Sequence, residues 1–212
     1  VHLSMSSGIS EGSVNTANVM ANSVCPEKIR VIDTKNAATG GTLIDIYAEY
    51  LAKEGLSAKE IVEELEEYKK SIQTAFFVPN PIGFLNSGRD KTSESVANKF
   101  KRLGLGALQK LGYKYRVDFN EEGNLNIKGM MRGISQTKAY EMVQEIVNDD
   151  TMEMYDSNTA VLGTVAEGVV DMEALEIYLK KYFNCVVRRD IGSTVAAYGS
   201  KDLIGLSLKR KR

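Results

Sequence analysis

The start of the chain sets its fold, because residues 1–13 read Val1-His2-Leu3-Ser4-Met5-Ser6-Ser7-Gly8-Ile9-Ser10-Glu11-Gly12-Ser13. This pattern indicates a short strand that runs into a turn rich in glycine and hydroxyl side chains. Backbone N–H groups, small side chains and serine hydroxyls at the beginning of a helix together stabilise an anion. The sequence therefore predicts a site for a carboxylate or a phosphate at this turn.

Length and composition indicate a protein of the soluble α/β class. The 212 residues are enough for one large domain or two small ones, and we expect two. The formal net charge of −1 gives no reason to expect nucleic acid as a partner. No apolar run approaches the roughly 20 residues of a membrane span. Cys25 and Cys185 are far apart, and we expect free thiols in a cytoplasmic protein.

Helices and strands alternate in the first third of the chain. Helices are expected over Ser13–Ser23, Thr42–Lys53 and Ser57 to about Lys70, and a strand over Lys28–Asp33. Ser57 and Glu60 form the pattern of a capping box. Because such alternation is typical of a parallel sheet covered by helices, residues 1–71 are predicted to form an N-terminal α/β/α domain. This domain is expected to be incomplete, since the chain starts inside a predicted strand that an upstream segment would pair with.

The pattern changes after Ser71, and residues 72–212 are predicted to form a second domain with a mixed sheet. Tyr113–Asn120 and Asn124–Met131 flank a turn at Gly123, as in an antiparallel hairpin. The other elements expected are helices over Thr92–Lys110, Ser135–Asn148 and Met172–Phe183, and strands over Gln73–Val78, Thr159–Val165, Cys185–Asp190, Val195–Tyr198 and Leu203–Lys209. The basic run 209–212 is expected to be a solvated end, with docking to an acidic partner as the alternative.

Motifs along most of the chain resemble those of the DegV family of fatty-acid-binding proteins. Residues 6–13 are similar to the family's S-S-G-[LI]-S-G-[ST] signature, and Val31-Ile32-Asp33-Thr34 before Gly40-Gly41 is similar to its strand ending in Asp-Ser or Asp-Thr. Phe84–Arg89 resembles its L-x-x-G-G-R segment, and Met131-Arg132-Gly133 resembles its V-R-G motif. The matches keep the order and spacing that the family shows.

The resemblance implies a two-domain α/β protein that binds a long-chain fatty acid and presents the carboxylate to a separate fatty acid kinase subunit, which makes the acyl phosphate. In this interpretation the chain is a carrier without catalytic residues, metal or cofactor, and residues 72–212 form much of the acyl tunnel. Burial of about fourteen methylenes would contribute on the order of 11 kcal/mol before entropy losses. A transient contact with a membrane surface is compatible with this interpretation.

The resemblance also assigns residues to the fatty-acid carboxylate. Ser7 is the first choice for the contact, with Ser6 and the backbone N–H of Gly8 in support, and Ser10 is expected to cap a helix. Arg89 suits either the carboxylate or a transferred phosphoryl group, because a guanidinium binds both. The alternative for Arg89 is a surface salt bridge.

The chain departs from the family pattern at three places. Glu11 is inserted after Ser10 and adds a negative charge, which should weaken anion binding unless its side chain points to solvent. Tyr198 stands near the position of a family histidine, and its hydroxyl can donate a hydrogen bond but does not titrate near neutral pH. The family's upstream T-S-Q-P motif, whose threonine shares the carboxylate, is absent from the sequence.

Two other functions are alternatives to fatty-acid binding. The strand followed by a serine-rich turn also resembles the phosphate loop of sugar isomerase domains, but these would have a single parallel sheet, and the hairpin at Gly123 does not fit one. A DegV-like domain that has lost ligand binding is the second alternative. A Ser-His-Asp hydrolase is disfavoured because His2 is the only histidine and lies in the first strand.

Overall fold

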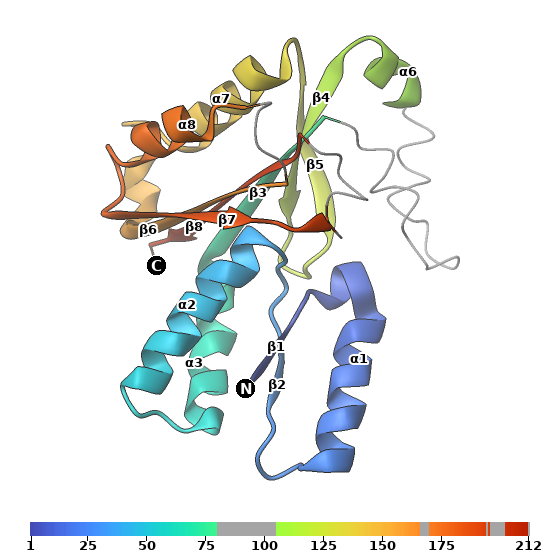
Figure 1. Ribbon diagram of the computed structural model, residues 1–212, viewed down its shortest axis with the longest axis vertical. Coiled ribbons are helices and arrows are strands. Elements are labelled where there is room, and N and C mark those ends of the chain that lie inside the picture. Colours follow the sequence, from blue (N-terminus) through green and yellow to red (C-terminus); the bar gives the residue numbers. More distant parts are fainter. Residues whose placement is uncertain (80–104, 166–169, 194, 196–201, 212) are drawn as a thin grey trace.

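The computed structural model describes residues 1–79, 105–165, 170–193, 195 and 202–211 (Figure 1). Arg89, Tyr198 and most of the helix expected over Thr92–Lys110 lie outside the described residues. The elements are, in chain order, β1 (His2–Ser4), α1 (Ser7–Val24), β2 (Val31–Asp33), α2 (Thr39–Lys53), α3 (Ala58–Tyr68), the 3₁₀ helix η1 (Lys69–Ser71), β3 (Ile72–Val78), α6 (Leu105–Lys110), β4 (Tyr113–Phe119), β5 (Leu125–Arg132), α7 (Ser135–Ile146), the 3₁₀ helix η2 (Met152–Met154), β6 (Tyr155–Thr164), α8 (Met172–Leu179), β7 (Cys185–Asp190) and β8 (Ile204–Arg210).

The described strands form two sheets. β1 and β2 pair in parallel, whereas the larger sheet has the order β5-β4-β3-β8-β6-β7. Within the larger sheet only β6 and β7 are parallel, and the other neighbours run antiparallel. In Figure 1, α1 lies on one side of the small sheet and α2 and α3 on the other, with the six-stranded sheet above them. The predicted mixed α/β class, with a small parallel sheet followed by a mixed sheet, is confirmed.

The six-stranded sheet has a core on each face, because successive side chains of a strand point to opposite sides. Phe77 of β3 belongs to the core that α7 and α8 cover, together with Met142 and Leu175. Phe76, one residue earlier, belongs to a second core with Tyr115 of β4. This second core also includes side chains of the β4–β5 hairpin, and it therefore extends toward the turn at Gly123.

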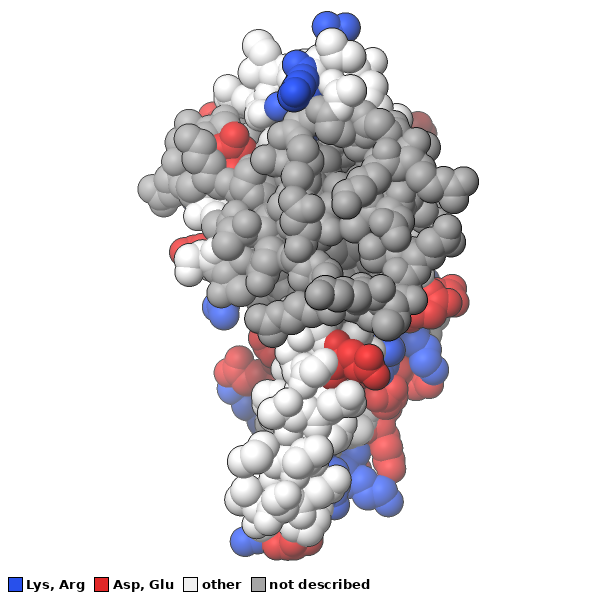
Figure 2. Space-filling model, turned by 90° about the vertical axis from the view of Figure 1, so that its right-hand side faces the viewer, with Lys and Arg blue, Asp and Glu red and all other residues white. Residues whose placement is uncertain are grey.

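The small sheet is packed far more densely on one side than on the other. Ile32 of β2 packs with Ile44 of α2 and Leu65 of α3 in a third core. On the other side, α1 buries only Ala21 among its 18 residues, and Glu11 is its one charged residue. Figure 2, which faces the side of α1, accordingly shows a largely uncharged surface on the lower part of the molecule.

Local signals predicted most elements near their observed bounds, and three predictions were wrong. α1 begins at Ser7 rather than Ser13, because Ser6 caps it from outside the helix. Val195, expected in a strand, has helical backbone. Arg210 is not part of a solvated end, because β8 extends through it and pairs it with Tyr155 of β6, whereas Lys209 lies in a strand as the prediction over Leu203–Lys209 has it.

Candidate functional site

The candidate site is the serine turn, Ser6-Ser7-Gly8, between the end of β1 and the first turn of α1. Ser6 is fully buried and is the N-cap residue of α1. Its hydroxyl oxygen accepts a hydrogen bond from the Gly8 N–H at 3.1 Å, and its proton is donated to the Gly123 carbonyl at 2.7 Å. Ser6 therefore joins α1 to the β4–β5 hairpin, and both hydrogen-bonding functions of its hydroxyl are used within the chain.

Two glycines allow this close approach of the turn to the hairpin. A Cβ atom at Gly8 would overlap the Gly123 carbonyl oxygen, and one at Gly123 would overlap Ser6 Oγ. Gly123 also has a φ of +81°, in the left-handed region that side chains disfavour. The serine turn thus depends on a residue that lies more than one hundred positions away in sequence.

Ser7 has a different environment from Ser6. It is half-buried, its N–H donates to Asp33 Oδ1 at 3.1 Å, and its Oγ accepts a hydrogen bond from Lys35 Nζ at 2.8 Å. The Ser7 side chain also makes a hydrogen bond with Asp33, which lowers the pKa of that carboxyl. The Ser7 hydroxyl therefore lies between the Asp33 carboxylate and the Lys35 ammonium group.

Asp33 and Lys35 form an ion pair that holds Ser7 in place. Lys35 Nζ lies 2.8 Å from Asp33 Oδ2, and the side chains are 34% and 17% exposed. Burial raises the pKa of Asp33, but hydrogen bonds from Lys35 and Ser7 outweigh burial and hold that pKa below its usual value. The Lys35 N–H also donates to Asp33 Oδ1 at 3.0 Å, and Lys69 Nζ donates to the Asp33 carbonyl at 2.8 Å.

The backbone around this ion pair is strained in the way that functional sites often are. Lys35 has a φ of 53°, which is uncommon for a residue other than glycine. Buried Thr34 anchors it, because the single proton of the Thr34 hydroxyl lies between the carbonyl oxygens of Ser4 and Asn36, which are 2.8 and 3.0 Å from Oγ1. The strand ends of β1 and β2 are thereby fixed together, and Lys35 is directed toward Ser7.

Ser10 and Glu11 lie at a kink of α1. Ser10 has non-helical angles of φ −145° and ψ 81°, and its hydroxyl pairs with that of Ser13 at 2.7 Å. Ser10 thus stands at the start of the second part of the helix, where a cap is expected, although it pairs with a hydroxyl rather than a backbone N–H. Glu11 is exposed, which is the condition under which its charge is compatible with an anion at the serine turn.

A chain of buried polar side chains connects the region of the site to the large sheet. Thr74 Oγ1 donates to Asn36 Oδ1 at 2.7 Å and pairs with Ser207 Oγ at 2.8 Å, and Ser207 Oγ bonds Thr39 Oγ1 at 2.7 Å. All four residues are at most 3% exposed. The start of α2 and the loop after β2 are therefore held against β3 and β8 by hydrogen bonds that water does not reach.

Sequence reasoning proposed Ser6, Ser7 and Gly8 as site residues, but it did not place Asp33, Lys35 and Gly123 beside them, as the structure does. The strand end at Asp33 was recognised as a motif, without a reason to place it against Ser7. Parallel pairing of β1 with β2 supplies that reason, since Ser4 lies opposite Asp33 and the residues that follow the two strands meet at one edge. Polar or charged side chains shortly after each of two parallel strands, Ser6 and Ser7 after β1 and Lys35 after β2, are the signal that could have found it.

Three further properties of the described residues bear on what the chain can do. No group of three or more His, Cys, Asp or Glu side chains in the described part of the chain could hold a metal ion. Cys25 and Cys185 are both free thiols, as expected. No helix among the described residues is long and apolar enough to cross a membrane.

Comparison with known proteins identifies a family and a fold. The family model described as "Uncharacterised protein, DegV family COG1307" matches residues 1–211. No curated protein sequence matches the chain.

Solved structures with the same fold include three that are described as binding fatty acids. A DegV family protein from Thermus thermophilus, described by its fatty acid binding, has a TM-score of 0.77 at 22% identity, over 99% of this chain and 71% of that one. One from Eubacterium eligens, loaded with heptadecanoic acid, has a TM-score of 0.73 at 18% identity, over 99% and 72%. The Streptococcus pneumoniae fatty acid kinase B3 protein, loaded with linoleic acid, has a TM-score of 0.73 at 17% identity, over 99% and 70%.

Proposed function

The chain belongs to the DegV family, and on that basis we propose that it binds a long-chain fatty acid at the serine turn and presents the carboxylate to a separate fatty acid kinase. In this proposal Ser7 contacts the carboxylate directly. Ser6 and Gly8 hold the turn in shape, because their hydrogen-bonding groups bond to one another and to Gly123. Arg89 and Tyr198 remain proposed contributors that lie outside the described residues.

The observation that carries the proposal is the ammonium group of Lys35 beside the Ser7 hydroxyl. A carboxylate placed here would take over the Ser7 proton from Asp33 and accept one of the three Lys35 protons, while Asp33 keeps its ion pair with Lys35. Charge-assisted hydrogen bonds of this kind contribute roughly 1.5–3 kcal/mol each. Because Asp33 already neutralises the charge of Lys35, the carboxylate head group contributes more to the orientation of the fatty acid than to its affinity.

The second core of the large sheet is the proposed surface for the acyl chain. The Ser6–Gly123 hydrogen bond places the serine turn at the tip of the hairpin whose strands carry Phe119 and Leu125, which pack against this core. Burial of a long tail that leaves Ser7 along this face would contribute about 0.8 kcal/mol of binding free energy per methylene. Affinity in this proposal comes from the tail.

Presentation to a kinase requires that the head group stay accessible. Ser7 is only half-buried and the Lys35 side chain is 34% exposed, so a phosphoryl donor can reach a carboxylate between them. The chain itself supplies no nucleophile with an adjacent histidine base, since His2 is the only histidine. In this proposal the chain is the carrier, and the kinase carries out the phosphoryl transfer. The sugar isomerase alternative, which requires one parallel sheet, is not supported by the mixed six-stranded sheet.

The proposal is tested by the ligand that the purified protein carries. We expect mass spectrometry of a denaturing extract to detect a long-chain fatty acid, and oleate to raise the melting temperature of the delipidated chain. A fatty acid kinase with ATP should then convert the bound oleate to its acyl phosphate. A lipid-free extract together with an unchanged melting temperature in oleate would refute fatty-acid binding.

A further inference from the structure

The N–H groups in the first turn of α1 all have acceptors within the chain. Those of residues 8–10 donate to the hydroxyl or the carbonyl oxygen of Ser6, at distances of 2.9–3.1 Å. The Ser7 N–H donates to Asp33 Oδ1. Three of the four groups therefore belong to a local cap, and the fourth is bound by a carboxylate that comes from the end of β2.

The Asp33 carboxylate accepts from the donors that a fatty-acid carboxylate would need at this turn. Its hydrogen bonds come from the N–H and the hydroxyl of Ser7 and from the N–H and the ammonium group of Lys35. A carboxylate accepts about four hydrogen bonds, so these donors saturate Asp33. Because a fatty acid has the same head group, it competes with Asp33 for the same protons.

The backbone of Asp33 is fixed, so only its side chain can move away from Ser7. Asp33 lies opposite Ser4 in the pairing of β1 with β2. Its carbonyl oxygen accepts from Lys69 Nζ at 2.8 Å, and the Lys69 side chain is only 10% exposed. The Asp33 side chain is itself 17% exposed. Rotation about its side-chain bonds can therefore turn the carboxylate toward water while the sheet stays unchanged.

We propose that Asp33 is an internal competitor of the fatty-acid carboxylate and thereby determines which ligands the serine turn accepts. This inference rests on the proposed fatty-acid function and deepens it. In the ligand-free chain Asp33 holds the Ser7 donors, and a bound fatty acid takes them over. A carboxylate that belongs to the chain has a high effective concentration at these donors. A ligand must therefore supply further binding energy from its tail.

Competition of this kind selects for long tails. We expect Asp33 to lower the affinity for a carboxylate about tenfold, which equals the contribution of about two methylenes. A short carboxylate such as acetate has no tail to offset this loss, and it does not displace Asp33. The head-group site thus favours long-chain acids before the surface for the acyl chain adds its own preference.

The experiment compares dissociation constants for oleate and oleyl alcohol between the delipidated chain and Asp33→Asn. The asparagine amide has the shape of the carboxylate without its negative charge. We therefore expect Asp33→Asn to bind oleate about tenfold more tightly and the alcohol with unchanged affinity.

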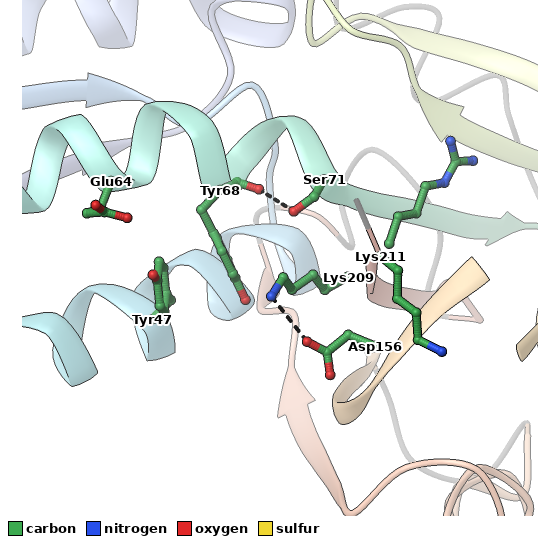
Figure 3. Close-up of a pocket in the computed structure, with 8 residues that line it drawn as sticks. Tyr47, Glu64, Tyr68, Ser71, Asp156, Lys209 and Lys211 are labelled. Carbon is green, nitrogen blue, oxygen red and sulfur yellow. Dashed lines mark hydrogen bonds and ion pairs between the residues drawn. The ribbon is translucent and has the colours of Figure 1, made fainter. Parts of the chain in front are cut away.

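Asp156→Asn is the matched control, because Asp156 also pairs with a lysine. Lys209 Nζ lies 3.1 Å from Asp156 Oδ2, in a cleft that contains no residue of the serine turn (Figure 3). The substitution makes the same change in net charge as Asp33→Asn, so it separates a local effect from a general one. Asp156→Asn should leave both dissociation constants unchanged.

A second measurement uses the unaltered chain and does not depend on the folding of a variant. Oleate should shift the side-chain carboxyl ¹³C resonance of Asp33, because the carboxylate loses its hydrogen bonds to Ser7. Oleyl alcohol should leave this resonance in place, since a hydroxyl head group does not replace a carboxylate at these donors.

The inference is overturned if Asp33→Asn binds oleate no more tightly than the unaltered chain, if Asp156→Asn gains as much affinity, or if oleate leaves the Asp33 resonance in place. Fatty-acid binding itself stands in each of these cases when the unaltered chain binds oleate. A lack of oleate binding by both the unaltered chain and Asp33→Asn would instead contradict the proposed function, and the inference with it.

Discussion

The serine turn and a cleft lined by Tyr47, Tyr68, Asp156 and Lys209 both lie where the N-terminal elements meet the six-stranded sheet, but they differ in the side chains that form them. The turn uses a buried hydroxyl and two glycines whose backbones nearly touch. The cleft uses long, partly exposed charged side chains around a hollow. Close packing therefore limits which substitutions the turn tolerates, whereas solvent screens the charge interactions in the cleft. Substitutions should accordingly cost more stability at the turn than at the cleft.

The largest effect should come from Gly123→Ala. The new methyl group would overlap Ser6 Oγ at a residue whose φ is +81°. We therefore expect the free energy of unfolding to fall by about 3 kcal/mol. Gly112→Ala is the matched control, because Gly112 has a φ of +83° with no atom near an added Cβ. That control should cost only about 1 kcal/mol. Urea unfolding of both variants measures the difference, and equal losses would show that Ser6 does not pack tightly against the hairpin.

A smaller effect should separate the two neighbouring serines. Ser6→Ala removes a helix cap and leaves the buried Gly123 carbonyl without its donor, which should cost about 2 kcal/mol of unfolding free energy. Ser7→Ala removes a half-buried hydroxyl and should cost roughly 0.5 kcal/mol or less. Thermal unfolding of the two variants provides the comparison. Equal destabilisation would contradict the division into a structural serine and a ligand-binding serine.

Acid should weaken the turn through Asp33. The folded-state pKa of Asp33 lies below the ordinary value of 3.8, so its ionised form contributes stability above that value and loses it as the pH falls through the folded-state pKa. Asp33→Asn should therefore reduce stability near neutral pH and flatten the decline in acid. Urea midpoints recorded across the acid range test this, and parallel curves for the two proteins would argue against the effect.

The smallest effect on stability is expected in the cleft. Lys209→Met removes the ion pair with Asp156 and the contact with the Tyr68 ring, but Lys209 is 36% exposed and solvent screens both interactions. We expect a loss below about 1 kcal/mol in urea unfolding. A loss as large as that of Gly123→Ala would mean that the cleft is a structural joint like the turn.

Elements that depend on neighbouring residues were predictable from the sequence. The capping box of Ser57 and Glu60 forms as expected, and the hairpin turns at Gly123. The strand over Cys185–Asp190 has its predicted bounds. In each of these cases the signal lies within a few residues, because side-chain caps, turn glycines and strand alternation act locally.

Features that depend on distant partners were not predictable. α1 begins six residues earlier than expected, because Ser6 is positioned by Gly123 and Ser7 by Asp33. β6 begins at Tyr155 rather than Thr159, across an irregularity in its pairing with β8. The sequence shows the charge of the basic run 209–212 but not the partners of its residues. Asp156 contacts Lys209 and Gln73 contacts Arg210 only in the folded sheet.

The central claim is that Ser7 recognises the carboxylate of a fatty acid, and one affinity comparison tests it directly. Oleate and oleyl alcohol share their tail and differ in the head group, so the ratio of their dissociation constants isolates the carboxylate. We expect the chain to bind oleate at least about tenfold more tightly than the alcohol. Ser7→Ala should remove most of this preference while leaving affinity for the alcohol unchanged. A Ser7→Ala variant that keeps the full preference for oleate would contradict the account.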